Sequence, residues 1–520
     1  MCGLVFAGLV TYAQNKQAKA FRETLAEANA MFDAEDYRHA ENKYLSIYGE
    51  EPDNEELNLG IAICKYKLKE LPDSIMPFLR KVEKSKYPEA QLYEARVLHL
   101  EHKFDEAIEH YKKYRKNFGE STREVKNEEV DRLIEISKRA QQYMSEPIKA
   151  LIKNVGPEIN TRYPEYVPLI SADESVMYFT SRRPGSTGDS VDAWGNYFED
   201  VYVSYNKEGK WQPAQNLGAP INTRTHDACA ALSADGQQMI IYRTSADGLS
   251  GDLYLAEATP GGWALPQKLG PQINTQFKEF SACFSPDGNS IVFSSDKPGG
   301  LGGKDLYRVV KLPNDKWSLP ANLGKEINTK YDEDAPFISA DGTTLYFSSK
   351  GHETMGDFDI FKSAIDEEGH YGKTESVGYP VNTVGDDIYF VVNASSRHGY
   401  YSSLNESRDE AGYESEDIYM IDMHYNATDV IVRKCVAQDA SGRPVAAKIT
   451  LLDKQAHKMS GLYHSNGNTG SFIIVVNPYC EYKLTAELKD HAPVEIDLPA
   501  AVSRPAGDGE DAVIKILFDH

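Results

Sequence analysis

The chain has 520 residues, which is too long for a single domain, so we expect three or four. Its formal net charge of −23 argues against binding to nucleic acid or to an anionic membrane surface, because both need clustered Lys and Arg; it fits a protein that meets basic partners. The six cysteines form no Cys-x-x-Cys pair and no zinc-ligand spacing, and we predict no metal and no cofactor.

The N-terminal residues 2–13 are almost wholly apolar and are followed by the polar run 14–17. The apolar run is too short to span a bilayer as a helix. Thr11-Tyr12-Ala13 resembles a signal-peptidase site, so the pattern predicts a signal peptide over residues 1–13, although the usual basic start is missing. The alternative is a buried N-terminal strand or helix. No other segment is apolar enough to cross a membrane.

A helical pattern fills residues 20–145. Ala28, Ala62 and Ala95 are separated by 34 and 33 residues, and small residues alternate with aromatic ones around them. This period resembles tetratricopeptide repeats, in which small residues let paired helices approach closely. Such repeats can serve as a packing scaffold alone, or as a concave surface that binds a partner protein.

From residue 146 to 426 one phrase, Asn-Val-Gly-Pro-Glu-Ile-Asn-Thr or a relative of it, occurs five times. Its copies begin at 154, 216, 268, 322 and 376, with spacings of 62, 52, 54 and 54 residues. After each copy come an acidic residue, an apolar run, a Ser-x-Asp-Gly turn, a β-branched run and an Asp-apolar-Tyr/Phe motif. Four strand-like runs per period predict a β-propeller blade.

The expected ring has five blades and is closed by residues 148–155, which copy the last-strand phrase ahead of the first blade. Closure would remove the exposed sheet edges of an open array. A sixth blade of unlike sequence is the alternative.

The acidic residue lies four positions after the Thr of every phrase, at the start of each expected innermost strand. One interpretation is a carboxylate ring around the axial channel that holds a cation or a basic side chain. The other, which we favour, is that each carboxylate accepts backbone N–H bonds within its own turn. The five candidates are Glu165, Asp227, Glu279, Glu333 and Asp387.

Two long loops, 182–199 in the first blade and 404–416 in the fifth, are expected to meet on one propeller face. Long loops in compact domains are often functional, and Trp, Tyr and Arg dominate binding hot spots. The alternative is that the aromatic side chains pack back onto the blades. The candidate partner-binding residues are Arg182, Arg183, Trp194, Tyr197, Phe198, Arg408 and Tyr413.

Residues 427–520 alternate between strand-like runs and turns, which predicts a small β-sandwich. Cys435 and Cys480 lie on strand-like runs, and an oxidising compartment would allow them to form a disulfide. We favour the alternative of two buried free thiols. The fold class is therefore multidomain: all-α helical repeats, then a five-bladed β-propeller, then a small β-sandwich.

The last segment resembles the carboxypeptidase regulatory-like domain through a pattern of apolar, Gly and Pro positions. The matching residues are Val436, Asp439, Gly442, Pro444, Val445, Ile449, Leu451, Gly470, Phe472, Tyr482 and Leu484.

The Ser-x-Asp-Gly blades resemble TolB-type, WD-like propellers, and the whole domain order resembles the PorE group of envelope proteins. That resemblance implies export to the periplasm, association with the outer membrane, and an accessory role in type IX secretion or gliding. Members of the group usually end in an OmpA-like domain, which puts peptidoglycan binding by this chain in doubt.

The sequence holds no Gly-x-Ser-x-Gly, no phosphate-binding loop and no His-Glu-x-x-His. We therefore predict a non-enzymatic scaffold that binds envelope proteins through its helical repeats and propeller face. The alternative is a periplasmic propeller that binds, senses or hydrolyses a glycan or peptide. A clustered acid–base or nucleophile–base pair on one propeller face would favour the alternative, and the sequence alone does not assemble one.

Overall fold

The computed structural model divides the chain into two compact units, residues 1–145 and 146–520. Within the described part, no helix is both long and apolar enough to cross a membrane. Side chains of the first helix are described from Gln17 onward. The structure describes the chain except for residues 1, 118, 120–123, 193–195, 246–249, 315, 367, 405–415, 424–429, 468, 501–512 and 519–520.

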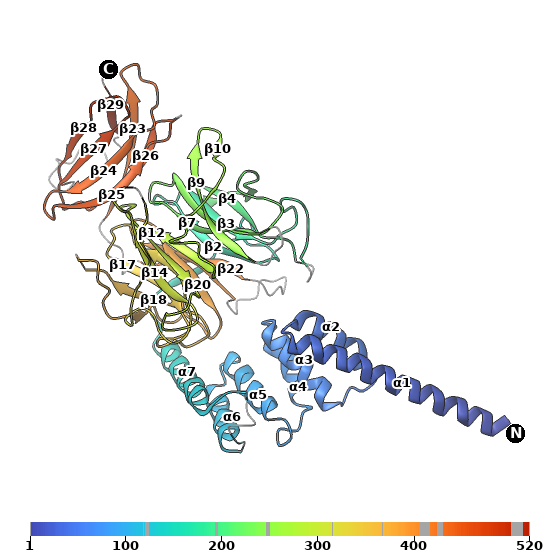
Figure 1. The fold of residues 1–520 in the computed structure, drawn as a ribbon. Coiled ribbons are helices and arrows are strands. Elements are labelled where there is room, and N and C mark those ends of the chain that lie inside the picture. The colour runs from blue at the N-terminus through green and yellow to red at the C-terminus, as the bar shows by residue number, and fades with distance from the viewer. Residues whose placement is uncertain are drawn as a thin grey trace. The chain divides into compact units, whose positions relative to one another are not determined.

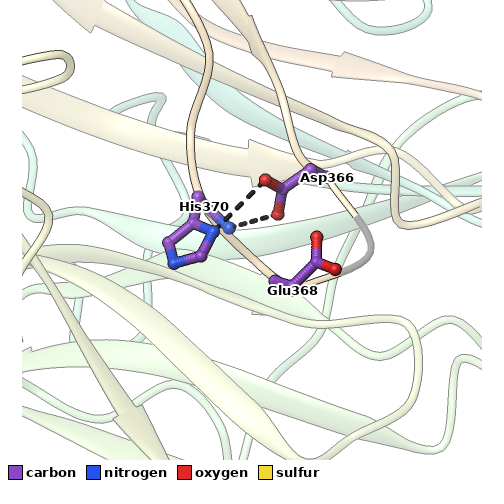
Figure 2. A group of neighbouring side chains, drawn as sticks. All are labelled: Asp366, Glu368 and His370. Atoms are coloured by element: carbon purple, nitrogen blue, oxygen red, sulfur yellow. Dashed lines mark hydrogen bonds and ion pairs between the residues drawn. The ribbon is translucent and has the colours of Figure 1, made fainter.

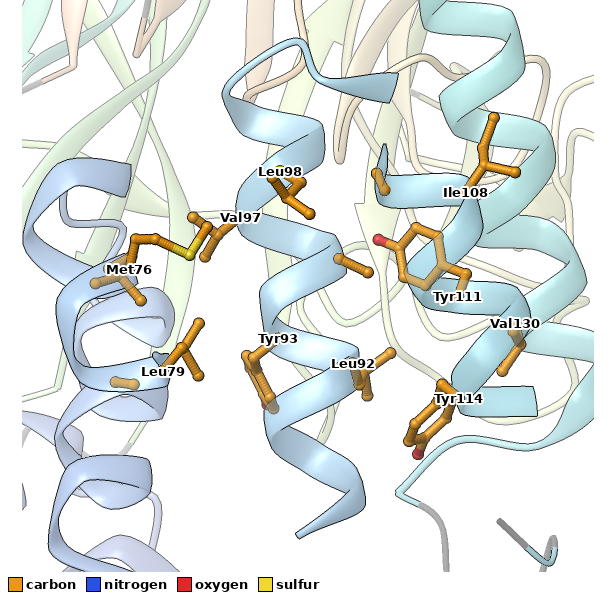
Figure 3. Close-up of a cluster of buried hydrophobic side chains, with 14 of the residues drawn as sticks. Met76, Leu79, Leu92, Tyr93, Val97, Leu98, Ile108, Tyr111, Tyr114 and Val130 are labelled. Atoms are coloured by element: carbon orange, nitrogen blue, oxygen red, sulfur yellow. The ribbon is translucent and has the colours of Figure 1, made fainter. Parts of the chain in front are cut away.

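The first unit is built from helices (Figure 1), and the alanines of the repeat, Ala28, Ala62 and Ala95, are fully buried between them. Figure 3 shows part of its core, in which Leu92 of α5 and Tyr111 of α6 belong to one buried cluster. The helices described are α1 Cys2–Asp33, α2 Tyr37–Tyr48, α3 Glu55–Lys67, α4 Pro72–Leu79, α5 Pro88–Leu100, α6 Phe104–Asn117 and α7 Asn127–Ser145.

The expected signal segment lies inside α1. Apolar signal segments are themselves helical, so export stays a prediction.

The close approach of α2 and α3 depends on Gly60. A Cβ at this position would lie 2.6 Å from Cζ of Tyr44, whose hydroxyl is held by a 2.7 Å bond to Asn29. We expect Gly60→Ala to destabilise the helical unit by about 1–3 kcal/mol through overpacking. Thermal melts followed by far-ultraviolet circular dichroism measure this. Gly49→Ala is the matched control, because no atom lies within 4 Å of its Cβ position. Equal midpoints for the two variants would contradict the prediction.

The second unit begins with five antiparallel sheets. Sheet I contains β2 to β6, sheet II β7 to β11, sheet III β12 to β15, sheet IV β16 to β19, and sheet V β20 to β22 with β1. Their bounds are β1 Leu151–Asn154, β2 Glu165–Ile170, β3 Val176–Ser181, β4 Asp200–Lys207, β5 Lys210–Trp211, β6 Gln215–Asn216, β7 Asp227–Leu232, β8 Gln238–Thr244, β9 Gly251–Thr259, β10 Gly262–Trp263, β11 Gln267–Lys268, β12 Glu279–Phe284, β13 Ser290–Ser295, β14 Asp305–Val310, β15 Ala321–Asn322, β16 Glu333–Ile338, β17 Thr344–Ser349, β18 Asp359–Ala364, β19 Glu375–Ser376, β20 Asp387–Val392, β21 His398–Ser403 and β22 Asp417–Asp422.

The Asn of each Ile-Asn-Thr turn fastens that turn to the preceding sheet. In one example, Asn328 Oδ1 accepts the N–H of Leu306 at 2.8 Å, and its Nδ2 donates to the carbonyl of the same residue at 2.9 Å. The same pair of hydrogen bonds, from one Asn side chain to one residue of a third strand, recurs at Asn160, Asn222, Asn274 and Asn382.

The first strands of the five sheets contact one another in the circular order β2, β7, β12, β16, β20 and back to β2. The strand expected from the early copy of the phrase is β1, which pairs antiparallel with β22 of sheet V. A sheet order that returns to its start around a central axis is that of a β-propeller. A cavity of about 80 Å³ lies where the innermost strands end, and all five of these strands contribute to its lining.

Two further sheets follow, with strand orders β26-β23-β29 and β25-β24-β27-β28. Side chains from both, among them Phe472, Ile449 and Leu484, form one buried cluster. The bounds are β23 Ile431–Asp439, β24 Lys448–Asp453, β25 Lys458–His464, β26 Ser471–Val476, β27 Tyr482–Glu487, β28 Val494–Leu498 and β29 Ile514–Phe518.

Candidate functional site

The two ends of the ring of innermost strands differ in chemistry. The end where the innermost strands finish is apolar, and Leu169, Ala231, Phe284, Ile338 and Val391 are among its lining residues. Polar and aromatic side chains from all five sheets gather at the end where these strands begin. We call this group the polar mouth; it consists of Tyr166, Arg182, Glu199, His226, Lys304, Asp334, Tyr389 and Glu416.

Strand direction explains why these residues meet. The first and second strands of a sheet are antiparallel, and so are the second and third, so the first and third begin at the same end. Tyr166, Asp334 and Tyr389 lie near the start of first strands. Glu199 and Glu416 directly precede third strands.

The closest contacts of the polar mouth centre on Glu199. The phenol of Tyr166 donates a hydrogen bond to its carboxylate. Nδ1 of His226 lies 3.2 Å from the other carboxylate oxygen and 3.3 Å from the backbone nitrogen of the same residue; it donates to the first when protonated and accepts from the second when not. The ring of Phe198 packs edge-on against His226 at 4.6 Å. Tyr166 and Glu199 therefore form a hydrogen-bonded pair of a phenol and a carboxylate, and His226 contacts the carboxylate.

The surroundings keep Glu199 ionised and Tyr166 protonated. Burial opposes ionisation of Glu199, but the His226 hydrogen bond and the charge of Arg182 outweigh it and hold its pKa below the usual value. Burial and the charge of Glu199 raise the pKa of Tyr166 well above its usual value. The pair thus carries one negative charge and one phenolic proton, located between the two side chains.

The phenol of Tyr389 feels the charges of three carboxylates. Its ring stacks on that of Tyr166 with centroids 6.5 Å apart. Burial, and then the charges of Asp334, Glu416 and Glu199, raise the pKa of its phenol well above the usual value. These carboxylates come from three different sheets. Among the described residues, the phenol oxygen of Tyr389 has no hydrogen-bond partner.

Asp334 is held more tightly than the other carboxylates. Its Oδ1 accepts bonds from the Ser281 hydroxyl at 2.5 Å and from the N–H of Ala335 at 2.8 Å, and its Oδ2 lies 2.7 Å from Nζ of Lys304. The same ammonium lies 3.9 Å from the centre of the Phe280 ring. Its buried, paired carboxylate suits holding Lys304 in place better than proton transfer.

The five predicted acidic residues are all fully buried, and each accepts hydrogen bonds from the Thr of its own turn. A side chain sixteen positions later adds a bond: a Ser hydroxyl in four sheets, and Arg243 to Asp227 in sheet II. Glu165 also pairs with Arg183 at 3.0 Å. Burial raises the pKa of Glu333 and of Asp387 to about 7 each.

The predicted loop residues have separate environments. Arg182 binds Asp192 at 2.8 Å and belongs to the polar mouth, whereas Arg183 bonds to Glu165. Tyr197 packs edge-on against Tyr163, and Phe198 against His226, as described above. Trp194, Arg408 and Tyr413 lie outside the described residues.

The two cysteines proposed for a disulfide, Cys435 and Cys480, are free thiols in this structure, and the first is buried.

Sequence reasoning missed most of the polar mouth: Tyr166, Glu199, His226, Lys304, Asp334, Tyr389 and Glu416. One signal was available, because Glu199 and Glu416 directly precede the Asp-apolar-Tyr motifs of sheets I and V. The pairing of Tyr166 with residues 33 and 223 positions away carries no local signature.

One group with metal-ligand chemistry occurs in the described part of the chain, at the exposed hairpin tip after β18 (Figure 2). Nδ1 of His370 lies 3.2 Å from Asp366 Oδ2, and the backbone N–H of His370 also bonds to Asp366. Glu368 is the third member. These hydrogen bonds hold the turn of the hairpin together, and this structural role accounts for the proximity of the side chains.

No family model matches the chain, and no curated protein matches it. Solved structures resemble it at low identity. An α-L-arabinofuranosidase from Lactobacillus brevis is 12% identical over 51% of this chain and 92% of its own, with a TM-score of 0.34. An endo-arabinase from Bacteroides thetaiotaomicron is 14% identical over 52% and 97%, also with 0.34. The β-propeller domain of the Trilobed protease from Pyrococcus furiosus is 7% identical over 65% and 81%, with 0.26.

At these values the likeness concerns the propeller fold alone and transfers no substrate or residue. Two sequence-based predictions are nevertheless corrected. The non-enzymatic envelope scaffold, and with it the predicted absence of enzymatic activity, is wrong as the main interpretation, and the finding that overturns it is the polar mouth. An acid–base or nucleophile–base pair on one propeller face was the feature named as favouring the alternative, and the hydrogen-bonded phenol of Tyr166 and carboxylate of Glu199 have the chemistry of such a pair.

Proposed function

We propose that this chain binds a glycan at the polar mouth and hydrolyses it. The observation that carries the proposal is the hydrogen bond between Tyr166 and the carboxylate of Glu199, beside the stacked ring of Tyr389. Hydrolysis of a glycosidic bond uses two carboxyl groups on opposite sides of the bond, and Glu199 and Glu416 are the two candidates in the polar mouth.

The partly exposed aromatic rings support a sugar as the ligand. Sugar rings offer apolar C–H faces as well as hydroxyl groups. The rings of Tyr166 and Tyr389 supply apolar surface, and the carboxylates and the phenol of Tyr389 supply acceptors and a donor for hydroxyls. Lys304 and Arg182 are already paired with carboxylates, so the mouth does not require a charged substrate.

The test uses the full chain and a panel of aryl glycosides and polysaccharides: pentofuranosides, hexopyranosides, N-acetylhexosaminides and 2-keto-acid sugars. Release of phenolate or of reducing ends measures hydrolysis, and calorimetry measures binding. We expect Glu199→Gln and Glu416→Gln to lower the rate by about 100-fold or more, the usual contribution of general acid–base groups. Asp334→Asn is expected to weaken binding.

Glu368→Gln, at the exposed hairpin tip, is the matched control and is expected to keep the wild-type rate. Circular dichroism of every variant checks the fold. Wild-type protein that neither binds nor cleaves any member of the panel would overturn the proposal, as would full activity in the triple variant Glu199→Gln, Asp334→Asn, Glu416→Gln.

We also infer the blade count of the propeller and the fold of the last two sheets. We interpret the five sheets as five blades of a ring closed by β1, and the last two sheets as a β-sandwich. The circular contacts of the innermost strands, the pairing of β1 with β22, and the buried cluster shared by the last two sheets support this.

A further inference from the structure

The hydrogen bond between Tyr166 and Glu199 places a phenol directly beside a carboxylate. A phenol hydrogen-bonded to an ionised carboxylate is a nucleophile with its base already in place. The phenol of Tyr166 bonds to Glu199 and is not otherwise engaged among the described residues, whereas the carboxylate is fixed by His226 as well. Its ring is held flat against Tyr389. The hydroxyl oxygen is therefore placed by two independent contacts, one on its ring and one on its proton.

We propose that Tyr166 is the nucleophile of the hydrolytic reaction and that Glu199 is its general base, an inference that rests on the proposed function of the same site. The reaction then passes through a covalent glycosyl–tyrosine, and the product keeps the anomeric configuration of the substrate. Most glycoside hydrolases that form a covalent intermediate use a carboxylate as the nucleophile. A tyrosine phenol in this role is a known exception.

In the first step the phenol oxygen of Tyr166 forms a bond to the anomeric carbon while its proton passes to Glu199. The glycosidic C–O bond breaks, and its electron pair stays on the leaving oxygen, which takes a proton from Glu416. In the second step water attacks the anomeric carbon and gives its proton to Glu416. The bond to the Tyr166 oxygen breaks, and Glu199 returns the proton to it. No oxidant or further reactant is needed.

The placement of the other carboxylates agrees with this division of roles. The carbonyl oxygen of Glu416 accepts the backbone N–H of Glu165, the neighbour of Tyr166, at 2.8 Å, and Glu416 enters the first step in its protonated form. Asp334 is saturated by Ser281, Ala335 and Lys304, so its proton-transfer capacity is low and its place is in binding. A neutral phenol also meets less repulsion from the neighbouring carboxylates than a further carboxylate nucleophile would.

The experiment traps the intermediate. The wild-type chain is incubated with the 2-fluoro form of whichever aryl glycoside it cleaves in the panel, and intact-protein mass spectrometry followed by peptide mapping locates the label. We expect one sugar on the peptide that contains Tyr166. Tyr166→Phe should abolish labelling and lower the rate of hydrolysis by about 100-fold or more. It should keep the fold, because the stacked ring remains. Tyr205→Phe, an exposed tyrosine of β4, is the control.

The outcomes separate the two levels of the argument. Cleavage by the wild type with the label on Glu199, Asp334 or Glu416, or with inverted product by NMR, would overturn the nucleophile assignment and leave the proposed function standing. Wild-type rates in Tyr166→Phe would do the same. Absence of any cleavage by the wild type would overturn both.

Discussion

Replacing Glu333 by Gln is expected to make the β unit more stable at about pH 8 and to leave its stability near pH 4 almost unchanged. Burial is the main cause, because Glu333 is fully buried, and its pKa is raised from 4.5 to about 7. The charge of Asp305 raises it further, and bonds from Thr329 and Ser349 only partly compensate.

The sign follows from the linkage of protons to folding. The folded-state pKa is higher than the unfolded one, so the contribution of Glu333 is fully present below about pH 4.5 and is lost as the pH rises through about 7. Gln does not titrate, and its oxygen and amide can serve the same Thr and Ser partners. At 1.36 kcal/mol per pKa unit the gain at about pH 8 is of the order of 3 kcal/mol.

Urea unfolding followed by tryptophan fluorescence measures this, because all four tryptophans lie after residue 145. The equivalent variant in sheet II, Asp227→Asn, is the matched control, and a smaller gain is expected from it. Burial also raises the pKa of Asp227, but its carboxylate pairs with Arg243, so the change removes that partner from a mostly buried guanidinium. A Glu333→Gln chain that is not more stable than wild type at about pH 8, or that gains equally near pH 4, would contradict the argument.

This contrast shows what the sequence predicts and what it does not. The five acidic residues occupy one register position, and the period alone predicts that they begin equivalent strands. It does not distinguish Glu165 and Asp227, which have arginine partners, from Glu333, which has hydroxyl partners. The difference arises from side chains of the second strand and the loop after it, whose identity varies between sheets.

The helical first part and the β-rich remainder were predictable because their periodicities differ and are each sustained over many residues. The run expected as a strand at Ile291 to Ser295 is part of β13, and the Asp305-Leu306-Tyr307 motif begins β14. The polar mouth was not predictable in the same way. Its members are single residues from sheets far apart in sequence, and they meet only because the sheets close around an axis.

The Asn of the recurring turn gives the last prediction, which concerns the largest loss of stability. Asn328 is 2% exposed, and its amide satisfies both backbone groups of Leu306 and bonds to Asn322 at 2.9 Å. Asn328→Ala leaves the buried N–H of Leu306 without an acceptor and removes three hydrogen bonds. An unsatisfied buried donor costs about 1–3 kcal/mol on its own, so we expect a total loss of about 3 kcal/mol or more.

Asn328→Asp separates the hydrogen-bond explanation from a loss of volume. Its carboxylate keeps the acceptor for Leu306 N–H but turns the donor into a second acceptor facing the carbonyl of the same residue. We therefore expect the variant to be at least as unstable as Asn328→Ala at neutral pH, and to recover part of the loss near pH 4, where a protonated carboxyl donates again.

Asn314→Ala, which replaces an exposed asparagine after β14, is the control and should change stability by less than about 0.5 kcal/mol. Equal urea midpoints for Asn328→Ala and Asn314→Ala would show that the recurring phrase does not fasten the sheets in the way its hydrogen bonds indicate.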